Sequence, residues 1–445
     1  MNAQQDTIYA LSSTPGRSAI SIIRISGKNA LFVTKKLTGG KLDTPKHQTA
    51  YPCSIYSVNN NLIDKIVLTF YCSPNSYTGE NLVEITTHGN PIIVDRLFNT
   101  LEGLGLRLAN PGEFTSRAYH NKKIDLIQAE STLSIINAKS KAGVQSSLQG
   151  VLGKLSDKLE NTKHQILLSL ADLEYELDIS EVDNSKTVVK KVVKKIVLII
   201  TEMEKLVQTH NISSILTDGA KIVIVGAPNV GKSTLLNALV DRERAIVTDK
   251  PGTTRDTIES LIYFSNYPVI LIDTAGLRQT NNKIESIGIR KTKQEIKSAD
   301  VIYNIQSKHK KNHKTDPKKT ISIYNKADLM AKDEIRKLQK KKPDSLIISA
   351  KKKTSLNKLR SKTENLLKLK TDSNDSLFLS SKRQQAALMR SMGHLKNAIT
   401  KESLNEIEII AHNLRLAINE FDWVLGKTTT NDILENLFSN FCVGK

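Results

Sequence analysis

The chain has 445 residues, of which 39% are hydrophobic, so it is long enough for two to four domains and too apolar for a disordered protein. Lysine and arginine number 65 against 45 aspartates and glutamates, and the formal net charge of +20 favours polyanionic partners. Because lysines recur along the whole chain, a general lysine bias explains the charge equally well, and charge alone does not establish RNA binding.

The cysteine content and the hydropathy favour a soluble cytoplasmic protein. The three cysteines are Cys53, Cys72 and Cys442, and the absence of a Cys-x-x-Cys pair argues against a disulfide framework or a zinc site. Residues 1–6 have neither a basic nor an apolar leader character. No apolar run approaches the length of a membrane span.

The first 120 residues are expected to form a mixed α/β region. Residues 18–25, 64–72 and 82–87 have the β-branched or alternating character of strands. A helix is expected after them, because apolar residues recur at helical spacing at Ile93, Leu97, Leu101 and Leu104.

Helical segments are expected on both sides of residues 218–370. From about residue 125 to 217 the pattern is helical. Within it, one long amphipathic helix is indicated by a stripe of apolar residues, Leu152, Leu155, Leu159, Ile166, Leu170, Leu173 and Leu177. A break is expected at 178–185, then a second helix to about His210. The chain is helical again from about residue 377, with a capping box at 403–406. The two segments could form one bundle with the intervening domain inserted, although chain order alone does not prove this.

Residues 218–370 alternate strands and helices, as a doubly wound parallel sheet requires. The apolar run 221–225 precedes Gly226-Ala227-Pro228-Asn229-Val230-Gly231-Lys232-Ser233, and the start of a helix follows. Strand, G-x-x-x-x-G-K-S and helix are the context of a phosphate-binding loop. We expect Lys232 to reach the β- and γ-phosphates and Ser233 to ligate Mg²⁺.

Three further motifs follow in the order that a GTP-binding protein needs, each after an apolar run. Asp273-Thr274-Ala275-Gly276 can hold Mg²⁺ through water and contact the γ-phosphate. Asn325-Lys326-Ala327-Asp328 offers a carboxylate to the two N–H donors of guanine, a pairing that adenine cannot make. Ser349-Ala350-Lys351 fits the loop that supports the base. The four motifs together indicate GTP rather than ATP.

These motifs do not identify the group that catalyses hydrolysis. Thr253 and Thr254 lie between the phosphate loop and Asp273, where a switch loop is expected. Leu277 stands where Ras-like enzymes carry the glutamine that orients the attacking water, and Gln279 is misplaced for that role. Hydrolysis therefore needs another stabiliser of transition-state charge and another group to orient the water.

The sequence resembles the TrmE-Era-EngA-like branch of GTPases and, within it, the family of tRNA modification GTPases called MnmE or TrmE. Residues 441–445, Phe-Cys-Val-Gly-Lys, are similar to the family's C-[IVL]-G-K signature. The N-terminal motifs also match, at residues 7–10, 15–17, 24–27, 77–80 and 110–115. The resemblance covers essentially the full length.

The resemblance implies an α+β multidomain fold. Residues 1–120 would form an α/β N-terminal domain that binds tetrahydrofolate and makes a homodimer. Residues 121–217 and 371–445 would form a helical bundle domain. Residues 218–370 would form a Ras-like doubly wound α/β G domain inserted in the helical domain. The G domains of the dimer are expected to meet across K⁺ and GTP, which switches hydrolysis on.

The resemblance also implies the residues of the nucleotide site. Ser233 and Thr254 match the Mg²⁺ ligands, and Glu285 matches the family's water-orienting glutamate. The K⁺ ligands would be Asn229, Thr248, the backbone of Lys250, and Thr253. The full set expected at GTP and its ions is Asn229, Val230, Gly231, Lys232, Ser233, Thr234, Thr248, Asp249, Lys250, Pro251, Gly252, Thr253, Thr254, Asp273, Thr274, Ala275, Gly276, Asn325, Lys326, Asp328, Ser349, Ala350 and Lys351.

A second site is implied by the same resemblance. Arg24, Glu84, Lys123 and Lys445 match positions that contact 5-formyl- or methylene-tetrahydrofolate, which would supply a one-carbon unit. Folate offers carboxylates to cations and pterin N–H donors to a carboxylate. Cys442 is close to Lys445 in sequence, and its chemical role stays open.

The implied partners are tRNA and a FAD- and NADH-using protein of the MnmG (GidA) type, in a heterotetramer or larger complex. Together they would add an aminomethyl or carboxymethylaminomethyl group to C5 of the wobble uridine, position 34. The alternative is a ribosome-assembly or RNA-binding switch of the Era or EngA type, which the 442–445 signature disfavours. The sequence departs from the family's pattern at two places. Lys250 replaces a residue of the potassium loop that is usually apolar in the family. The basic segment 307–319 is unlike the family's usual loop; we expect it to be a solvated surface loop, with RNA contact as the alternative.

Overall fold

The computed structural model describes residues 6–179, 185–241, 259–265, 267–273, 294–306, 315–367, 377–400, 406–428 and 430–445. The chain divides into two compact units. Unit 1 comprises Met1–Leu133, Gly150–Ile200 and Ala386–Lys445, and unit 2 comprises Ser134–Gln149 and Thr201–Gln385. The three-domain boundaries given above remain a prediction, and each unit is described by itself.

Unit 1 contains a six-stranded sheet in the order β3-β4-β5-β2-β1-β6. Neighbouring strands are antiparallel, except that β1 and β6 are parallel. The strands are β1 (Ile8–Leu11), β2 (Ile20–Ser26), β3 (Thr49–Tyr56), β4 (Leu62–Tyr71), β5 (Leu82–His88) and β6 (Arg107–Leu108).

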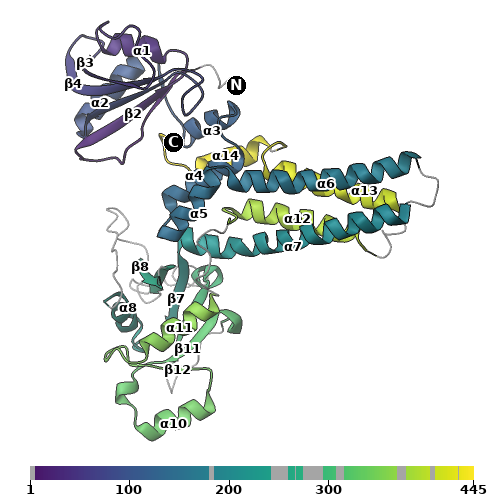
Figure 1. Ribbon diagram of the computed structural model, residues 1–445. Helices are drawn as coiled ribbons and strands as arrows, with labels where there is room; N and C mark the ends of the chain where they lie inside the picture. The colour runs from purple at the N-terminus through teal and green to yellow at the C-terminus, as the bar shows by residue number, and fades with distance from the viewer. Residues whose placement is uncertain are drawn as a thin grey trace, which may run out of the picture. The chain divides into compact units, whose positions relative to one another are not determined.

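Helices α1 (Ala30–Leu37) and α2 (Pro91–Gly103) pack on one face of this sheet (Figure 1). Alternate strand residues such as Ile23 and Val83 are fully buried in the core that these helices cover. The strand residues between these buried ones point to the other face. Arg24 and Glu84 are two of them, and they lie directly opposite each other in the pairing of β2 with β5. The alternation expected at 82–87 is therefore confirmed.

The helical part of unit 1 includes residues from both sides of the segment that carries the nucleotide motifs. Its elements are α3 (Glu113–His120), α4 (Leu126–Asn137), α6 (Lys154–Ile179), α7 (Ser185–Asp218), α12 (Lys382–Ala398), α13 (Ile407–Val424) and α14 (Asn431–Ser439); α4, α7 and α12 each extend beyond unit 1. Within unit 1, α6, α7, α12 and α13 run alongside one another (Figure 1). Lys163 on α6 pairs with Asp422 on α13 at 2.5 Å, and Asp172 on α6 pairs with Lys195 on α7 at 3.2 Å. The predicted packing of the two helical segments as one bundle is confirmed.

The long helix predicted from the apolar series is confirmed in its centre and wrong at its start. Residues Leu155 to Leu173 of the series are buried, whereas Leu152 lies in a turn between α5 (Lys141–Val151) and α6 and is 61% exposed. Leu177 is on α6 but is 39% exposed. The second helix, α7, continues to Asp218 because Ile215 and Leu216 extend its apolar face into the core of unit 2. The expected break and most of the capping box lie outside the described residues.

Unit 2 contains a second six-stranded sheet, in the order β12-β11-β10-β7-β9-β8. All neighbours are parallel except β8 with β9, as the alternating pattern predicted. The strands are β7 (Ala220–Gly226), β8 (Glu259–Phe264), β9 (Tyr267–Asp273), β10 (Val301–Gln306), β11 (Thr320–Tyr324) and β12 (Leu346–Ile347). Its helices include α8 (Lys232–Val240), α10 (Lys332–Lys341) and α11 (Leu356–Leu366). The carboxyl ends of the parallel strands share one edge, where ligand-binding loops of such sheets gather.

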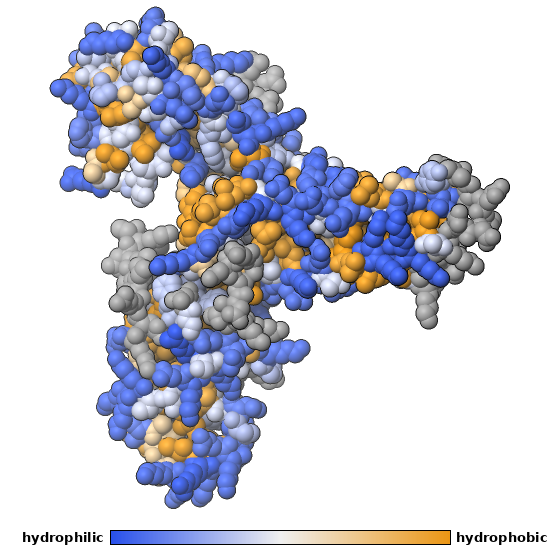
Figure 2. Space-filling model, in the orientation of Figure 1, coloured by the Kyte–Doolittle hydropathy of each residue, from blue (hydrophilic) through white to orange (hydrophobic). Residues whose placement is uncertain are grey.

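Hydrophilic residues cover much of the visible surface of both units, with apolar residues in scattered groups (Figure 2). Exposed lysines occur in several parts of the fold, including Lys35 beside the first sheet, Lys190 and Lys194 on α7, and Lys337 on α10. This distribution agrees with a general lysine bias as one source of the net charge. Within the described ranges, no helix is both long and apolar enough to cross a membrane.

The bundle packing gives a test with an internal control. Leu173→Ala removes a fully buried side chain of α6 and should lower the free energy of unfolding by about 2–5 kcal/mol. Leu177→Ala, on the same helix but 39% exposed, should change it by about 0.5 kcal/mol or less. Urea unfolding can be followed by the fluorescence of Trp423, the single tryptophan, which lies on α13. Equal losses in the two variants would contradict this packing.

Candidate functional site

The phosphate loop lies between β7 and α8 at the carboxyl edge of the unit 2 sheet, as predicted. Gly231 has a φ of +91°, and a Cβ there would lie 2.4 Å from Nδ2 of Asn325, so the loop closes only around a glycine. α8 begins at Lys232, and its first N–H groups and positive dipole end face the loop. The loop thus has the backbone form of an anion cradle.

Two side chains that were expected to act on phosphate and Mg²⁺ lie at this loop. The Nζ atom of Lys232 donates to the carbonyls of Gly226 and Ala227 at 3.2 and 3.0 Å, which holds this buried ammonium group along the loop. The Ser233 hydroxyl donates to Oδ2 of Asp273, at the end of β9, at 2.8 Å. A hydroxyl next to a carboxylate is a donor set that suits Mg²⁺.

The guanine motifs lie after β11 and β12 and are tied to the phosphate loop. Asn325 donates to the carbonyl of Val230 at 3.1 Å and accepts from the N–H of Ala350 at 3.0 Å. Lys326 donates to the carbonyl of Asn229 at 2.7 Å. The two base-side loops and the phosphate loop are therefore one hydrogen-bonded assembly.

The carboxylate expected to recognise guanine is held in its ionised form. The Ser349 hydroxyl donates to Oδ1 of Asp328, and this hydrogen bond lowers the pKa of Asp328 below its usual range. Ser349 also accepts from the N–H of Lys352 at 3.1 Å, which fixes the hydroxyl. Thr234, on α8 beside Gly231, and Lys351, which follows Ala350, are both exposed.

The remaining residues predicted for the nucleotide lie outside the described residues. They are Thr248, Asp249, Lys250, Pro251, Gly252, Thr253, Thr254, Thr274, Ala275, Gly276 and the proposed catalytic Glu285. Among the described residues, no group of three or more histidine, cysteine, aspartate and glutamate side chains is arranged to hold a metal ion.

A second polar cluster lies on the open face of the unit 1 sheet, where three of the four predicted folate residues meet. Nε of Arg24 donates to Oε1 of Glu84 at 2.7 Å, and both side chains are about one-quarter exposed. Nη1 of Arg24 donates to the carbonyl of Gly444 at 3.4 Å, which brings residue 445 to the same place. We call Arg24, Glu84, Tyr71, Tyr77, Gly444 and Lys445 the Arg24 site.

Lys445 lies near Arg24, and its environment disfavours a second positive charge. Burial, and then the proximity of the Arg24 guanidinium, lower the pKa of Lys445, while Cys442 acts in the opposite direction. Two cations that converge in this way favour an anionic group between them.

Lys123, the fourth predicted folate residue, lies against the loop that follows β4. A Cβ on Gly79 would be 3.2 Å from Cγ of Lys123. The structure brings Lys123 beside this loop, without a hydrogen bond or ion pair to Arg24 or Glu84.

The tyrosines of the Arg24 site were missed as site residues. The Arg24 guanidinium lies over the ring of Tyr77 at 5.9 Å, and the Tyr71 hydroxyl donates to Oε2 of Glu84 at 3.4 Å. Burial, and then the charge of Glu84, raise the pKa of Tyr71. Strand parity was the available signal for Tyr71, because it follows Val67 and Thr69 on the open face.

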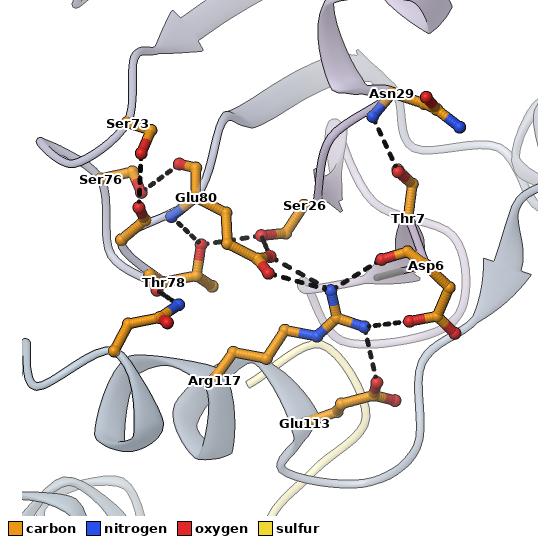
Figure 3. Close-up of polar contacts among 12 residues, drawn as sticks. Asp6, Thr7, Ser26, Asn29, Ser73, Ser76, Thr78, Glu80, Glu113 and Arg117 are labelled. Atoms are coloured by element: carbon orange, nitrogen blue, oxygen red, sulfur yellow. Dashed lines mark hydrogen bonds and ion pairs between the residues drawn. The ribbon is translucent and has the colours of Figure 1, made fainter. Parts of the chain in front are cut away.

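The loop that carries Tyr77 is held by the buried guanidinium of Arg117 (Figure 3). Arg117 donates to Oε2 of Glu80 at 3.1 Å, to Oδ1 of Asp6 at 2.8 Å and to Oε1 of Glu113 at 3.0 Å. Ser26 on β2 donates to the same Glu80 oxygen at 2.7 Å. One cation therefore fixes α3, the 76–80 loop and the start of β1 together.

The sheet order and the phosphate loop define a nucleotide-binding protein of the G-domain class, combined with a bundle and a second α/β region. Comparisons agree with this description. The family profile described as "MnmE helical domain" matches residues 126–442, and that described as "GTP-binding protein TrmE N-terminus" matches residues 7–123.

Curated relatives match over the full length. The "tRNA modification GTPase MnmE" of Fervidobacterium nodosum is 36% identical over an alignment of 460 residues, gaps included, that covers 100% of this chain and 98% of the relative. The protein of the same name from Clostridioides difficile is 35% identical over 456 residues, 99% of each chain. Among solved structures, the G domain of the T. maritima FeoB iron transporter is 22% identical over 33% of this chain and 98% of its own, with a TM-score of 0.24, too low to support a conclusion. The chain belongs to the MnmE family.

The Arg117 cluster predicts a pH-dependent stability. Burial would raise the pKa of Glu113, but hydrogen bonds from Arg107, the Asn110 N–H and Arg117 outweigh it and lower that pKa. The stabilisation is therefore complete above the unfolded-state value, about 4.3, and is lost as the pH falls through the lower folded-state value. Glu113→Gln should cost about 1.5–3 kcal/mol at pH 7 and progressively less toward pH 3.

The measurement is the apparent Tm of wild type and Glu113→Gln from calorimetry between pH 7 and pH 3. Asp43→Asn is the control, because its pair with Lys35 is exposed and should contribute at most about 1 kcal/mol. A Tm difference for Glu113→Gln that stays constant down to pH 3 would contradict the role given to this carboxylate.

Proposed function

We propose that this chain is a K⁺-dependent GTPase that acts with a FAD-dependent partner on tRNA. The reaction would add an aminomethyl or carboxymethylaminomethyl group to C5 of the wobble uridine, position 34. The coarser statement, a GTP-hydrolysing enzyme of tRNA modification, follows from the family and from the names of the full-length relatives. The observation that carries the proposal is the presence in one chain of a guanine-type G site and the Arg24 site.

The nucleotide part rests on the hydrogen-bonded loops of unit 2. The ionised carboxylate of Asp328 suits the two N–H donors of guanine, and Lys232 lies along the loop where phosphates would bind. Mg²⁺ would be held by Ser233 and Thr254, and K⁺ by Asn229, Thr248, Lys250 and Thr253. When bound, these cations neutralise charge on the phosphates.

Glu285 is our candidate for orienting the attacking water. Leu277 cannot do so, because its side chain has no acceptor. A potassium ion would supply the charge stabilisation that an arginine finger supplies in other GTPases.

The modification part rests on the Arg24 site. Arg24 and Lys445 converge as cations for a carboxylate, and Glu84 offers oxygens to pterin N–H donors. The ligand would be 5-formyl- or methylene-tetrahydrofolate, with Lys123 as a further contact. Cys442 is exposed and has an open role in the chemistry.

The proposed partners are tRNA, a second copy of this chain in a homodimer, and an MnmG (GidA)-type FAD protein, in the cytoplasm. The Era- or EngA-type switch is the weaker alternative, because relatives named for tRNA modification match the whole chain.

Potassium dependence is tested by the cation and by Asn229. GTP hydrolysis by wild type should be about tenfold faster in K⁺ than in Na⁺, equivalent to about 1.4 kcal/mol of transition-state stabilisation. Asn229→Gly should abolish the difference, because it removes the side-chain ligand but tolerates the φ of +63° found there. Asn237→Ala, exposed on α8, is the control and should keep the difference. Equal wild-type rates in the two salts would reject the potassium assignment.

The function as a whole is tested in cells that lack this protein. Nucleoside mass spectrometry of their tRNA should find C5-modified wobble uridine reduced to background. Re-expression of the wild-type chain should restore the modification, whereas an Arg24→Ala variant should not. An undiminished level in the deleted cells would reject the proposed reaction.

A further inference from the structure

Residues 442–445, which we call the 442–445 segment, lie on the unit 1 sheet beside the turn that follows β1. The Ser12 hydroxyl donates to the carbonyl of Gly444 at 3.0 Å. The same carbonyl accepts the longer bond, 3.4 Å, from Nη1 of Arg24. Phe441, immediately before the segment, is buried with Phe438 and Leu126. The chain is therefore anchored up to residue 441. The Cys442 carbonyl then accepts a long hydrogen bond from the Gly112 N–H at 3.4 Å, and Gly444 is held by the two bonds given above.

The fit of the segment is specific to glycine. Gly444 is buried with a φ of +94°, and a Cβ at this position would lie 2.4 Å from the carbonyl oxygen of Leu11. The backbone of the segment thus lies directly against the end of β1, where only a residue without a side chain can approach so closely.

We propose that Ser12 is a positioning residue for the Arg24 site: its hydroxyl holds the Gly444 carbonyl and thereby places Lys445 beside Arg24 for an anionic group of the ligand. This inference rests on the proposed folate function and adds to it a group that need not contact the ligand. Ser12 acts through the segment, whereas Arg24 and Lys445 act on the ligand.

The assignment to Ser12 follows from the geometry of the donors. Of the two bonds to the Gly444 carbonyl, the one from Nη1 of Arg24 is the weaker, because it measures 3.4 Å against 3.0 Å for the bond from Ser12. The Ser12 backbone is fixed by its own N–H, which donates to the carbonyl of Ile22 at 2.7 Å. The hydroxyl therefore projects from a rigid strand end. The half-buried state of Lys445 agrees with a held rather than a freely moving side chain.

Ser12→Ala removes the hydroxyl and leaves the backbone bond to Ile22 intact. We expect it to weaken binding of 5-formyltetrahydrofolate about tenfold, measured by isothermal titration calorimetry on the full chain. Ser12→Thr keeps a hydroxyl and should restore most of the affinity. Ser13→Ala is the matched control: its hydroxyl accepts from the Ile22 N–H at 3.1 Å and does not contact the segment, so affinity should stay within about twofold.

Two readouts separate positioning from a general loss of stability. Lys445→Met already lacks the ammonium group. Adding Ser12→Ala to it should cause little further loss of affinity for 5-formyltetrahydrofolate, because both changes remove the same contact of Lys445 with the ligand. Hydrogen–deuterium exchange without ligand should show faster exchange in a peptide covering 442–445 in Ser12→Ala than in wild type or Ser13→Ala.

The outcomes that overturn the inference differ from those that overturn the proposed function. Wild-type binding by Ser12→Ala, or additive losses with Lys445→Met, would overturn the positioning role and leave the folate site standing. Unchanged exchange of the 442–445 peptide would overturn it without reference to any ligand. A wild-type chain that does not bind 5-formyltetrahydrofolate would overturn the folate part of the proposed function.

Discussion

The N-terminal part of the molecule depends on the neutralisation of one buried cation. The Arg117 side chain is 7% exposed, and carboxylates from three separate segments surround it: Asp6, Glu80 and Glu113. Removing one partner from such a buried group leaves charge without compensation, which is far more costly than losing an exposed pair. Through Glu80, this cluster fixes the loop whose Tyr77 lies beneath Arg24. The orientation of the Arg24 site is thus set by a residue outside it.

The two sites differ in how they are encoded, and this decides what could be predicted. The phosphate loop could be predicted because its two glycines, Lys232 and Ser233 lie within the short segment 226–233, and their spacing alone brings them together. The sequence predicted an end of α7 near His210, whereas the helix continues to Asp218. Its last turns pack into the core of unit 2 and not into the bundle, so the apolar stripe of the bundle does not reveal them. Ser12 and Arg117 could not be assigned from periodicity, and strand parity indicates the face on which Tyr71 lies but not its partner. Their partners are reached through strand register or a turn, across intervals such as the 432 residues from Ser12 to Gly444.

The electrostatics of the Arg24 site are unfavourable by themselves and complementary to an anion. Arg24 and Lys445 are two cations held close together, and the carboxylate of Glu84 is already paired with Arg24. Their repulsion is tolerated because backbone geometry at Gly444, and not attraction between the side chains, fixes Lys445. A carboxylate that enters between them would relieve this repulsion. The fold therefore preorganises the site for an anion, which favours its binding.

The distance along the chain between Ser12 and Gly444 also orders events during synthesis. At about 5–20 residues per second, the 432 residues from Ser13 to Gly444 take roughly 20–90 seconds to translate. The first sheet and the G-type sheet can both form in that time, while the Arg24 site lacks the backbone that completes it. This site therefore matures after the residues of both sheets have been made. A chain truncated before Gly444 would have a complete phosphate loop and an incomplete second site.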